Sequence, residues 1–252
     1  MALETAAELW GSADYERLSR PFAPIHAELV ELLQPARGTR WLDVATGTGG
    51  VALLAAHAGA DVVGVDIAPR MIEIARAKAG TLPVRFDVGN AEALPYREAQ
   101  FDVVSSVFGV IFAPDHGRAA NELARVCRAR LGLAVWRPNP ELEEVYSRFG
   151  LFPHEGPDAF EWGRQEYLEA LLADAFELEI TSRTWTLDAP SGEAVWELWL
   201  SGAPPFRTRV ESLDPDRRED FRRAYVEYCE RFPADGGVAV PREYLVVLGT
   251  RR

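Results

Sequence analysis

The residues best suited to chemistry in this 252-residue chain lie in and after segment 42–50, which reads L-D-V-A-T-G-T-G-G. Gly47 and Gly49 are separated by one residue, a spacing that permits a tight backbone turn and the close approach of a ligand. Asp43 precedes this turn by four residues. Asp66 ends the next expected strand, where a carboxylate can accept hydrogen bonds from ribose hydroxyls. These residues predict a site for a ligand that contains a nucleoside.

The elements that must position these residues alternate between short buried runs and longer amphipathic stretches. Such a pattern predicts a parallel sheet covered by helices. Strands are expected at residues 40–45, 61–66, 83–88, 101–107 and 131–136, helices near 49–58, 69–79 and 117–128, and a loop at 89–100. Because parallel strands end at one edge of an open sheet, Asp43, Asp66 and Asn90 are expected to meet in a crevice there.

The flanking segments complete an α/β fold with a doubly wound, mostly parallel sheet of seven strands. Further elements are expected as helices at 25–33, 164–174 and 215–231 and as strands at 176–187 and 242–250. The predicted organisation is residues 1–36 as two N-terminal helices over the ligand site, 37–187 with 236–252 as the α/β domain, and 188–235 as a helical cap. The cap is expected to be an insertion before the last strand.

Composition limits the function classes. Lys and Arg number 27 against 39 Asp and Glu, which gives a net charge of −12 and argues against nucleic acids or anionic membranes as partners. Cys127 and Cys229, both in expected helices, form no C-x-x-C pair, so a reducing compartment and no metal site are expected. No run approaches the ~18 apolar residues of a membrane span. A cytoplasmic protein is therefore expected.

Four motifs in order resemble the class I S-adenosylmethionine (SAM)-dependent methyltransferases. They read L-D-V-A-T-G-T-G-G at 42–50, V-V-G-V-D-I-A-P-R-M at 62–71, N-A-E-A-L-P at 90–95 and F-D-V-V-S-S-V-F-G at 101–109. Within that class the chain is similar to the ubiquinone/menaquinone-biosynthesis C-methyltransferase group and its relatives that act on small molecules. The resemblance is strong over residues 40–136 and implies a Rossmann-like methyltransferase fold.

The resemblance also implies a role for each cofactor-binding residue. The methionine part of SAM would be lined by Gly47, Thr48 and Gly49, and its ammonium would lie above Asp43. The ribose would be held by Asp66, the adenine would be enclosed by Ile67 and Met71, and its amino edge would meet Asn90 and Ala91. Tyr15 would cover the cofactor, and Ala45 and Val107 would complete the site. The charges agree with this interpretation, because SAM carries an ammonium and a sulfonium but no phosphate.

Two other functions remain open at this point. A nicotinamide-dependent oxidoreductase would also use Gly47, Gly49 and Asp66. Against it, Asp43 would place a negative charge under the pyrophosphate, and the single lysine, Lys78, is not preceded by a tyrosine at the Tyr-x-x-x-Lys spacing. The second alternative is a methyltransferase-like module that binds SAM or S-adenosylhomocysteine (SAH) without catalysis.

The acceptor is expected to be a small, fairly apolar molecule under the cap. Residues 106–112 read S-V-F-G-V-I-F, unlike the N/D-P-P-Y that marks amino-group methylation of adenine and glutamine. They also differ from the S-F-G-L-R-N typical of the quinone group, which leaves a more apolar wall and argues against quinone C-methylation. Transfer to carbon, nitrogen or oxygen stays open.

The histidines and tryptophans offer few catalytic candidates. His154 is the weak candidate for a catalytic residue, whereas His116 is expected in the first turn of a helix capped by Asp115, and His26 and His57 are expected on helix surfaces. The tryptophans expected mainly in the core, with some able to wall an apolar site, are Trp136, Trp162, Trp185, Trp196 and Trp199. Exposed tryptophans of the cap leave room for a homodimer.

Overall fold

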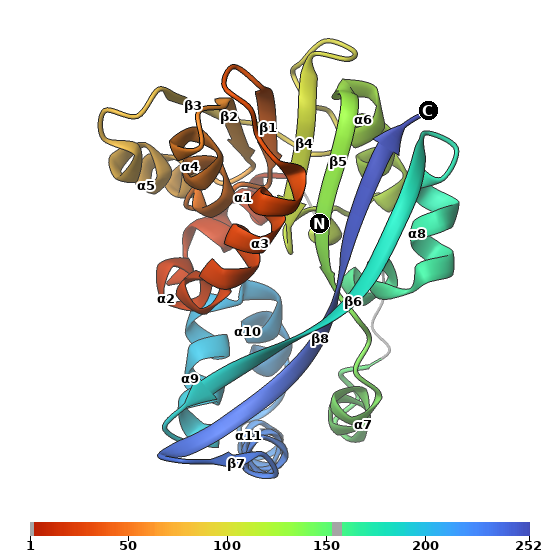
Figure 1. Cartoon of the computed structure of the whole chain (residues 1–252). Coiled ribbons are helices and arrows are strands. Elements are labelled where there is room, and N and C mark those ends of the chain that lie inside the picture. Colours follow the sequence, from red (N-terminus) through yellow and green to blue (C-terminus); the bar gives the residue numbers. More distant parts are fainter. Residues whose placement is uncertain (1–2, 153–157) are drawn as a thin grey trace.

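A computed structural model describes residues 3–152 and 158–252. Its core is one sheet with the strand order β3-β2-β1-β4-β5-β8-β6 (Figure 1). The strands are β1 (Arg40–Val44), β2 (Asp61–Asp66), β3 (Val84–Val88), β4 (Phe101–Val107), β5 (Cys127–Trp136), β6 (Phe176–Ala189) and β8 (Gly237–Arg251), and the two-residue β7 (Pro233–Ala234) pairs with β8. Strands β1 to β5 are parallel and β8 is antiparallel to both neighbours. The expected seven-stranded, mostly parallel α/β sheet is confirmed.

Helices pack on both faces of the sheet, as the amphipathic stretches predict. They are α1 (Leu3–Gly11), α2 (Tyr15–Ser19), α3 (Ala23–Leu33), α4 (Gly50–His57), α5 (Pro69–Ala79), α6 (His116–Val126), α7 (Pro140–Arg148), α8 (Gln165–Leu172), α9 (Gly192–Gly202), α10 (Pro204–Glu211) and α11 (Pro215–Glu230). Short 3-10 helices lie at Arg20–Phe22, Val110–Phe112 and Ala159–Gly163. Within the described ranges, no helix is long and apolar enough to cross a membrane.

Two local expectations need correction. Residues 3–33 form three helices instead of two, because Asp14 caps a separate α2 and Pro21 lies in a 3-10 turn before α3. Cys127 is expected from the sequence in the helix at 117–128, but it is the first residue of β5. There its backbone is extended and pairs with Phe101 of β4, so sheet pairing ends the helix at Val126. Cys229 lies in α11 as expected.

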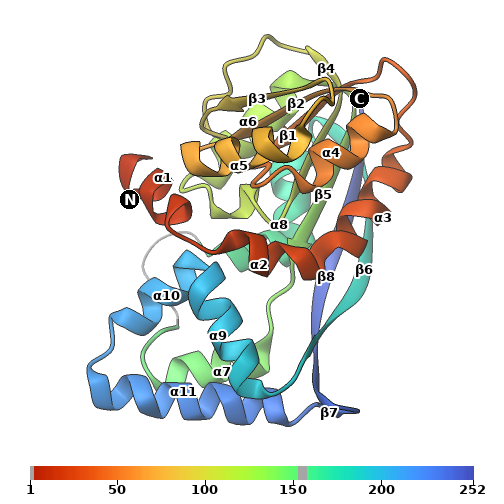
Figure 2. The same cartoon turned by 90° about the vertical axis from the view of Figure 1, so that its left-hand side faces the viewer.

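The helices α9, α10 and α11 are called here the cap helices. They follow β6, precede β8 in the chain and form a cluster with α7 below the sheet (Figure 2). An aromatic group of Trp196, Phe206, Phe221 and Tyr225 fills this cluster with ring centroids 5.2–6.2 Å apart. Trp196 is only 4% exposed. It therefore offers no surface for a homodimer, contrary to the expectation of exposed cap tryptophans.

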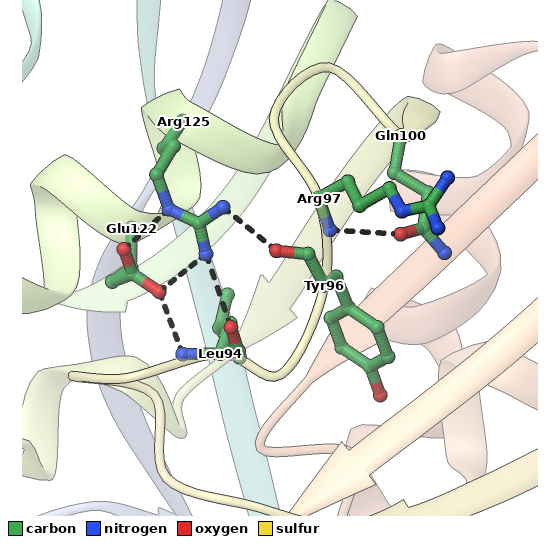
Figure 3. A network of polar contacts seen from close by, with 6 residues as sticks. All are labelled: Leu94, Tyr96, Arg97, Gln100, Glu122 and Arg125. Carbon is green, nitrogen blue, oxygen red and sulfur yellow. Dashed lines mark hydrogen bonds and ion pairs between the residues drawn. The ribbon is translucent and has the colours of Figure 1, made fainter.

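The loop after β3 has the irregular form expected for residues 89–100, and α6 fixes its position (Figure 3). Arg125 donates hydrogen bonds to the carbonyl oxygens of Tyr96 (2.7 Å) and Leu94 (3.0 Å) and forms an ion pair with Glu122 (2.6 Å). The Leu94 N–H donates to Glu122 in turn (2.6 Å). This network stabilises the loop that presents Asn90 to the carboxyl edge of the sheet.

Candidate functional site

The glycine turn after β1 is held by the carboxylate at the end of β2. The Gly47 N–H donates to Asp66 Oδ2 (2.9 Å), and the Ala68 N–H donates to Oδ1 (2.9 Å). Asp66 is 8% exposed, and burial raises the pKa of its carboxyl although these backbone donors oppose the rise. The Ile67 N–H also acts on this carboxylate, whose two oxygens together offer about four acceptor positions. Asp66 therefore fixes the turn and can still receive ligand hydroxyls.

Asp43 lies beneath the same turn. Its Oδ2 accepts a hydrogen bond from Thr46 Oγ1 (2.6 Å) and its Oδ1 accepts one from Ser105 Oγ (2.8 Å). Ser105 in turn accepts from Trp41 Nε1 (2.8 Å). Burial raises the pKa of the Asp43 carboxyl to about 6. The side chain thus anchors β1 to β4 and places a carboxyl under the turn, where the sequence predicted one.

Tyr15 of α2 lies over the turn. A Cβ built on Gly47 would approach Tyr15 Cε1 to 2.8 Å, so the ring rests directly on the glycine backbone. Helices α1 and α2 lie between the sheet and helices α9 and α10 (Figure 2). Burial raises the pKa of Tyr15, and the nearby charges of Asp66 and Asp43 add to the effect. Tyr15 therefore packs α2 against the glycine turn.

A cavity opens at this edge of the sheet and contains most of the predicted cofactor residues. Those that line it are Tyr15, Ala45, Gly47, Asp66, Ile67, Met71, Asn90 and Ala91. Asp43, Thr48 and Val107 line a second cavity, on which Tyr15 and Ala45 also border. Gly49 lines neither cavity. Its φ of +87° closes the turn, and a Cβ there would meet Phe86 Cζ at 3.2 Å, so this glycine serves the packing of α4 on the sheet.

The cavity continues to an aromatic wall that the sequence analysis predicted in part. Its aromatic members beyond Tyr15 are Trp10, Phe22, Phe108, Phe112, Trp136 and Trp199. Phe108 and Trp136 are stacked, with ring centroids 3.7 Å apart and 3° between their planes. Trp136 and Trp199 belonged to the tryptophans that could wall an apolar site. Phe108 and Phe112 lie in segment 106–112, from which a more apolar wall was predicted. Trp10 and Phe22 carry no local signal, because only the fold brings their segments to the cavity.

The second cavity contains a polar group of side chains around Lys78. Its Nζ forms an ion pair with Glu16 of α2 (2.6 Å) and donates to Thr48 Oγ1 (3.1 Å). His26 lines the same cavity and packs on the first residue of α4, since a Cβ on Gly50 would meet the His26 Nδ1 at 2.5 Å. His26 is therefore not the helix-surface residue that its sequence position predicted. Lys78 connects the glycine turn to the N-terminal helices.

His26 makes the stability of the fold depend on pH. Burial, followed by the charge of Lys78, lowers the pKa of His26 to about 4. Because the unfolded chain binds this proton near pH ~6.5, the folded state loses stability as the pH falls from ~6.5 towards ~4. In His26→Gln this loss is absent. We expect its unfolding free energy, relative to the wild type, to rise by about 2 kcal/mol between about pH 7 and about pH 4.5, as measured by urea unfolding.

His57→Gln is the matched control, because His57 is exposed on α4. Its stability relative to the wild type is expected to be the same at both pH values. An equal response of the two variants would show that His26 is not protected from protonation in the folded protein.

The other histidine candidates differ in their outcome. His116 begins α6, and the Asp115 side chain caps that helix by accepting from the Arg118 N–H (2.9 Å), as expected. The His116 Nδ1 lies 2.9 Å from the Tyr167 hydroxyl, and His116 lines neither cavity. His154 lies outside the described residues.

Comparison with known proteins agrees with this geometry. The methyltransferase-domain model Methyltransf_11 matches residues 42–130. An uncharacterised protein of Mycobacterium tuberculosis is 37% identical in an alignment 182 positions long, which covers 68% of this chain and 65% of that protein. The chain thus spans just under two thirds of the length of such relatives.

Relatives with named activities match as well. A demethylmenaquinone methyltransferase of Thermus thermophilus is 42% identical over 118 residues, 44% of this chain and 54% of that protein. Nocamycin O-methyltransferase of Saccharothrix syringae is 29% identical over 270 residues, covering 92% of each chain. The fold matches magnesium protoporphyrin IX methyltransferase of Synechocystis, solved with bound SAH, at 16% identity with a TM-score of 0.63 over 99% of both chains. Residues 42–130 thus match the methyltransferase domain, and the relatives with named activities and the SAH-bound structure are methyltransferases.

Proposed function

We propose that the protein transfers a methyl group from SAM to a small, largely apolar acceptor. The continuity of the cavity carries this proposal. One part of its lining contains the glycine turn and Asp66, and another contains Phe108, Trp136 and Trp199. A donor held by the first part and an acceptor packed against the second would share one enclosed site.

The residues around the turn fit SAM. Only glycine at position 47 leaves room beneath Tyr15, because a Cβ there would meet the ring at 2.8 Å. Asp66 has free acceptor positions for ribose hydroxyls. Met71, 2% exposed, and Ile67 provide apolar surface for an adenine ring. Asp43 adds a carboxyl beneath the turn, which suits a ligand with a cationic end.

The contribution of the protein to the reaction is alignment in a dry site. Bound SAM supplies an electrophilic methyl group on its sulfonium. Holding two reactants in line can contribute up to about 7–11 kcal/mol to barrier lowering, and the stacked Phe108 and Trp136 give that region an apolar wall. In the described part of the chain, the titratable side chains that line the cavity are Tyr15 and Asp66, and both pKa values are raised. An acceptor that ionises without a strong base therefore suits the site.

The relatives support a small-molecule acceptor, since the two with named activities are a demethylmenaquinone and a nocamycin methyltransferase. The net charge of −12 supports the same class over nucleic acids. Cys127 and Cys229 are buried and unpaired, which supports a reducing, cytoplasmic compartment.

Calorimetric titration with SAH, with NAD and NADP in parallel, tests the cofactor. Micromolar binding of SAH alone is expected, and binding of a nicotinamide instead would contradict the proposal. Radiolabelled methyl transfer from SAM to a panel of small phenols, amines and enols then tests catalysis. Tight SAH binding without transfer to any acceptor would favour a non-catalytic SAH-binding module.

A further inference from the structure

Lys78, the single lysine of the chain, joins three elements of the fold. It lies in the last turn of α5 and forms an ion pair with Glu16 of α2, with 2.6 Å between Nζ and Oε1. The same Nζ donates a hydrogen bond to Thr48 Oγ1 in the glycine turn (3.1 Å). One ammonium group therefore connects α5, α2 and the turn.

The two partners of Lys78 lie beside the contact between Tyr15 and Gly47. Glu16 follows Tyr15 in the chain, and Thr48 follows Gly47. The contact is close, since a Cβ on Gly47 would lie 2.8 Å from Tyr15 Cε1. Tyr15 and Gly47 both line the cavity that contains most of the predicted cofactor residues, whereas Lys78 lines the second cavity. Lys78 is thus placed to fix this contact from outside the cofactor cavity.

Helix α5 also contributes to the cofactor cavity. Met71, which lines that cavity and is 2% exposed, lies seven residues before Lys78 on α5. Residues at this spacing share one face of a helix. The lysine therefore ties together the three elements that supply Tyr15, Gly47 and Met71.

The other polar contacts around α2 lead to the cap helices. The N–H of Asp14, which precedes α2, donates to the Ser201 carbonyl oxygen (3.1 Å). Arg207 of α10 donates to Ser12 Oγ (2.6 Å). In the part of the chain that the structure describes, Lys78 provides the only ion pair or hydrogen-bonded link from α2 to the glycine turn or α5. Without it, the packing of Tyr15 on the turn has no polar support.

A lysine suits this position. Its ammonium has three donors on a flexible stem, so it can serve a carboxylate and a hydroxyl at once. The side chains of Lys78 and Glu16 are 37% and 31% exposed. Partial shielding from water makes their attraction stronger than that of a fully exposed pair. The link can therefore affect how α2 is held.

We propose that Lys78 is a positioning residue for the cofactor, which holds Tyr15 on Gly47 so that the site is formed before SAM binds. The inference rests on the proposed function, in which SAM lies at the glycine turn, and it adds a residue outside the predicted cofactor set. Without the link, α2 leaves the turn in a fraction of the molecules. The apparent affinity for the cofactor then falls with the fraction that keeps Tyr15 in place.

Calorimetric titration of the full-length protein with SAH tests this role. Lys78→Met keeps the apolar stem and is expected to bind SAH about 3- to 10-fold more weakly, as the loss of a partly shielded ion pair and a hydrogen bond allows. Glu16→Gln, which alters the other end of the link, is expected to weaken binding as well. The double variant should bind no more weakly than Lys78→Met, because the two side chains act as a unit.

Exchange of the two charged residues tests for rescue. Glu16→Lys combined with Lys78→Glu forms the ion pair with reversed polarity, and the Thr48 hydroxyl can donate to the new carboxylate. The exchange variant is expected to recover most of the SAH affinity that Lys78→Met loses. A lysine that contacts the cofactor itself would give no such recovery.

Arg183→Met is the matched control. The ion pair of Arg183 with Glu28 is 2.8 Å long, its side chains are 38% and 31% exposed, and neither residue lines either cavity. Its loss is expected to lower the melting temperature about as much as the loss of Lys78 does. SAH affinity should stay at the wild-type value, which separates a positioning role from a general loss of stability.

The outcomes distinguish this inference from the proposed function. Wild-type SAH affinity in Lys78→Met would overturn the role of Lys78. Weaker binding in Lys78→Met with normal binding in Glu16→Gln and no rescue by the exchange would overturn it too. If Lys78→Met does not fold, Glu16→Gln and the exchange variant decide by the same criteria. Failure of the wild type to bind SAH would instead contradict the proposed function itself.

Discussion

Asp66→Ala is expected to weaken SAH binding by at least about 100-fold and to destabilise the protein. The substitution removes the acceptor of two backbone N–H groups, from Gly47 and Ala68. A buried donor left without its partner costs about 1–3 kcal/mol, and the ribose would lose its acceptor as well. The sequence position of Asp66 suggests a solvated strand end whose loss leaves the fold intact. Its 8% exposure predicts a lower melting temperature instead.

Two variants separate these effects. Asp61→Ala alters the exposed carboxylate at the opposite end of the same strand and is expected to change neither SAH affinity nor melting temperature. Asp66→Asn keeps one acceptor oxygen, so its loss of affinity should be intermediate. Calorimetry and thermal unfolding measure both quantities. Normal SAH affinity in a folded Asp66→Ala protein would refute the assignment of the cofactor site.

Gly47→Ala is expected to abolish measurable SAH binding at micromolar concentrations. The residue has a φ of +54°, and a new Cβ would lie 2.8 Å from the Tyr15 ring. A left-handed backbone costs a non-glycine residue roughly 1–2 kcal/mol. The larger effect is steric, because the Tyr15 ring, which lines the same cavity as Gly47, must move.

Gly38→Ala is the control for the cost of placing alanine in a left-handed backbone. Gly38 has a φ of +79°, but nothing lies within 4 Å of a Cβ placed there. The variant should lose a similar amount of stability and keep the SAH affinity of the wild type. If both variants bound SAH equally well, contact between Tyr15 and the turn would have no part in cofactor binding.

The parts of the fold that follow from local patterns were predictable. Strands β1, β2, β4 and helix α5 have the expected bounds to within a residue, because buried β-branched runs end at glycine, aspartate or proline signals. Cys127 shows the limit of such patterns. It continues an amphipathic helical stretch in sequence, but pairing with Phe101 on a distant strand decides its conformation.

The cofactor side of the site was more predictable than the acceptor side. The glycine turn and Asp66 belong to contiguous motifs, so their residue types and spacing carry the information. His26 carries none, since a lone histidine on a helix is ordinarily a surface residue, whereas it lines the second cavity. Its surroundings come from segments far apart in the chain, as the ion pair between Glu28 and Arg183 also illustrates.

The long pairing of β6 with β8 has a consequence for how the segment between these strands can vary. The register runs from Phe176 opposite Arg251 to Ala189 opposite Val238, so the chain leaves and re-enters the sheet at neighbouring residues. The pairing of β6 with β8 therefore holds the two ends of the intervening segment together and offsets the entropic cost of closing it. Segments of very different length could be exchanged between these two positions while the glycine turn and Asp66 keep their places. The segment between the two strands can then change in length and sequence without displacing the glycine turn.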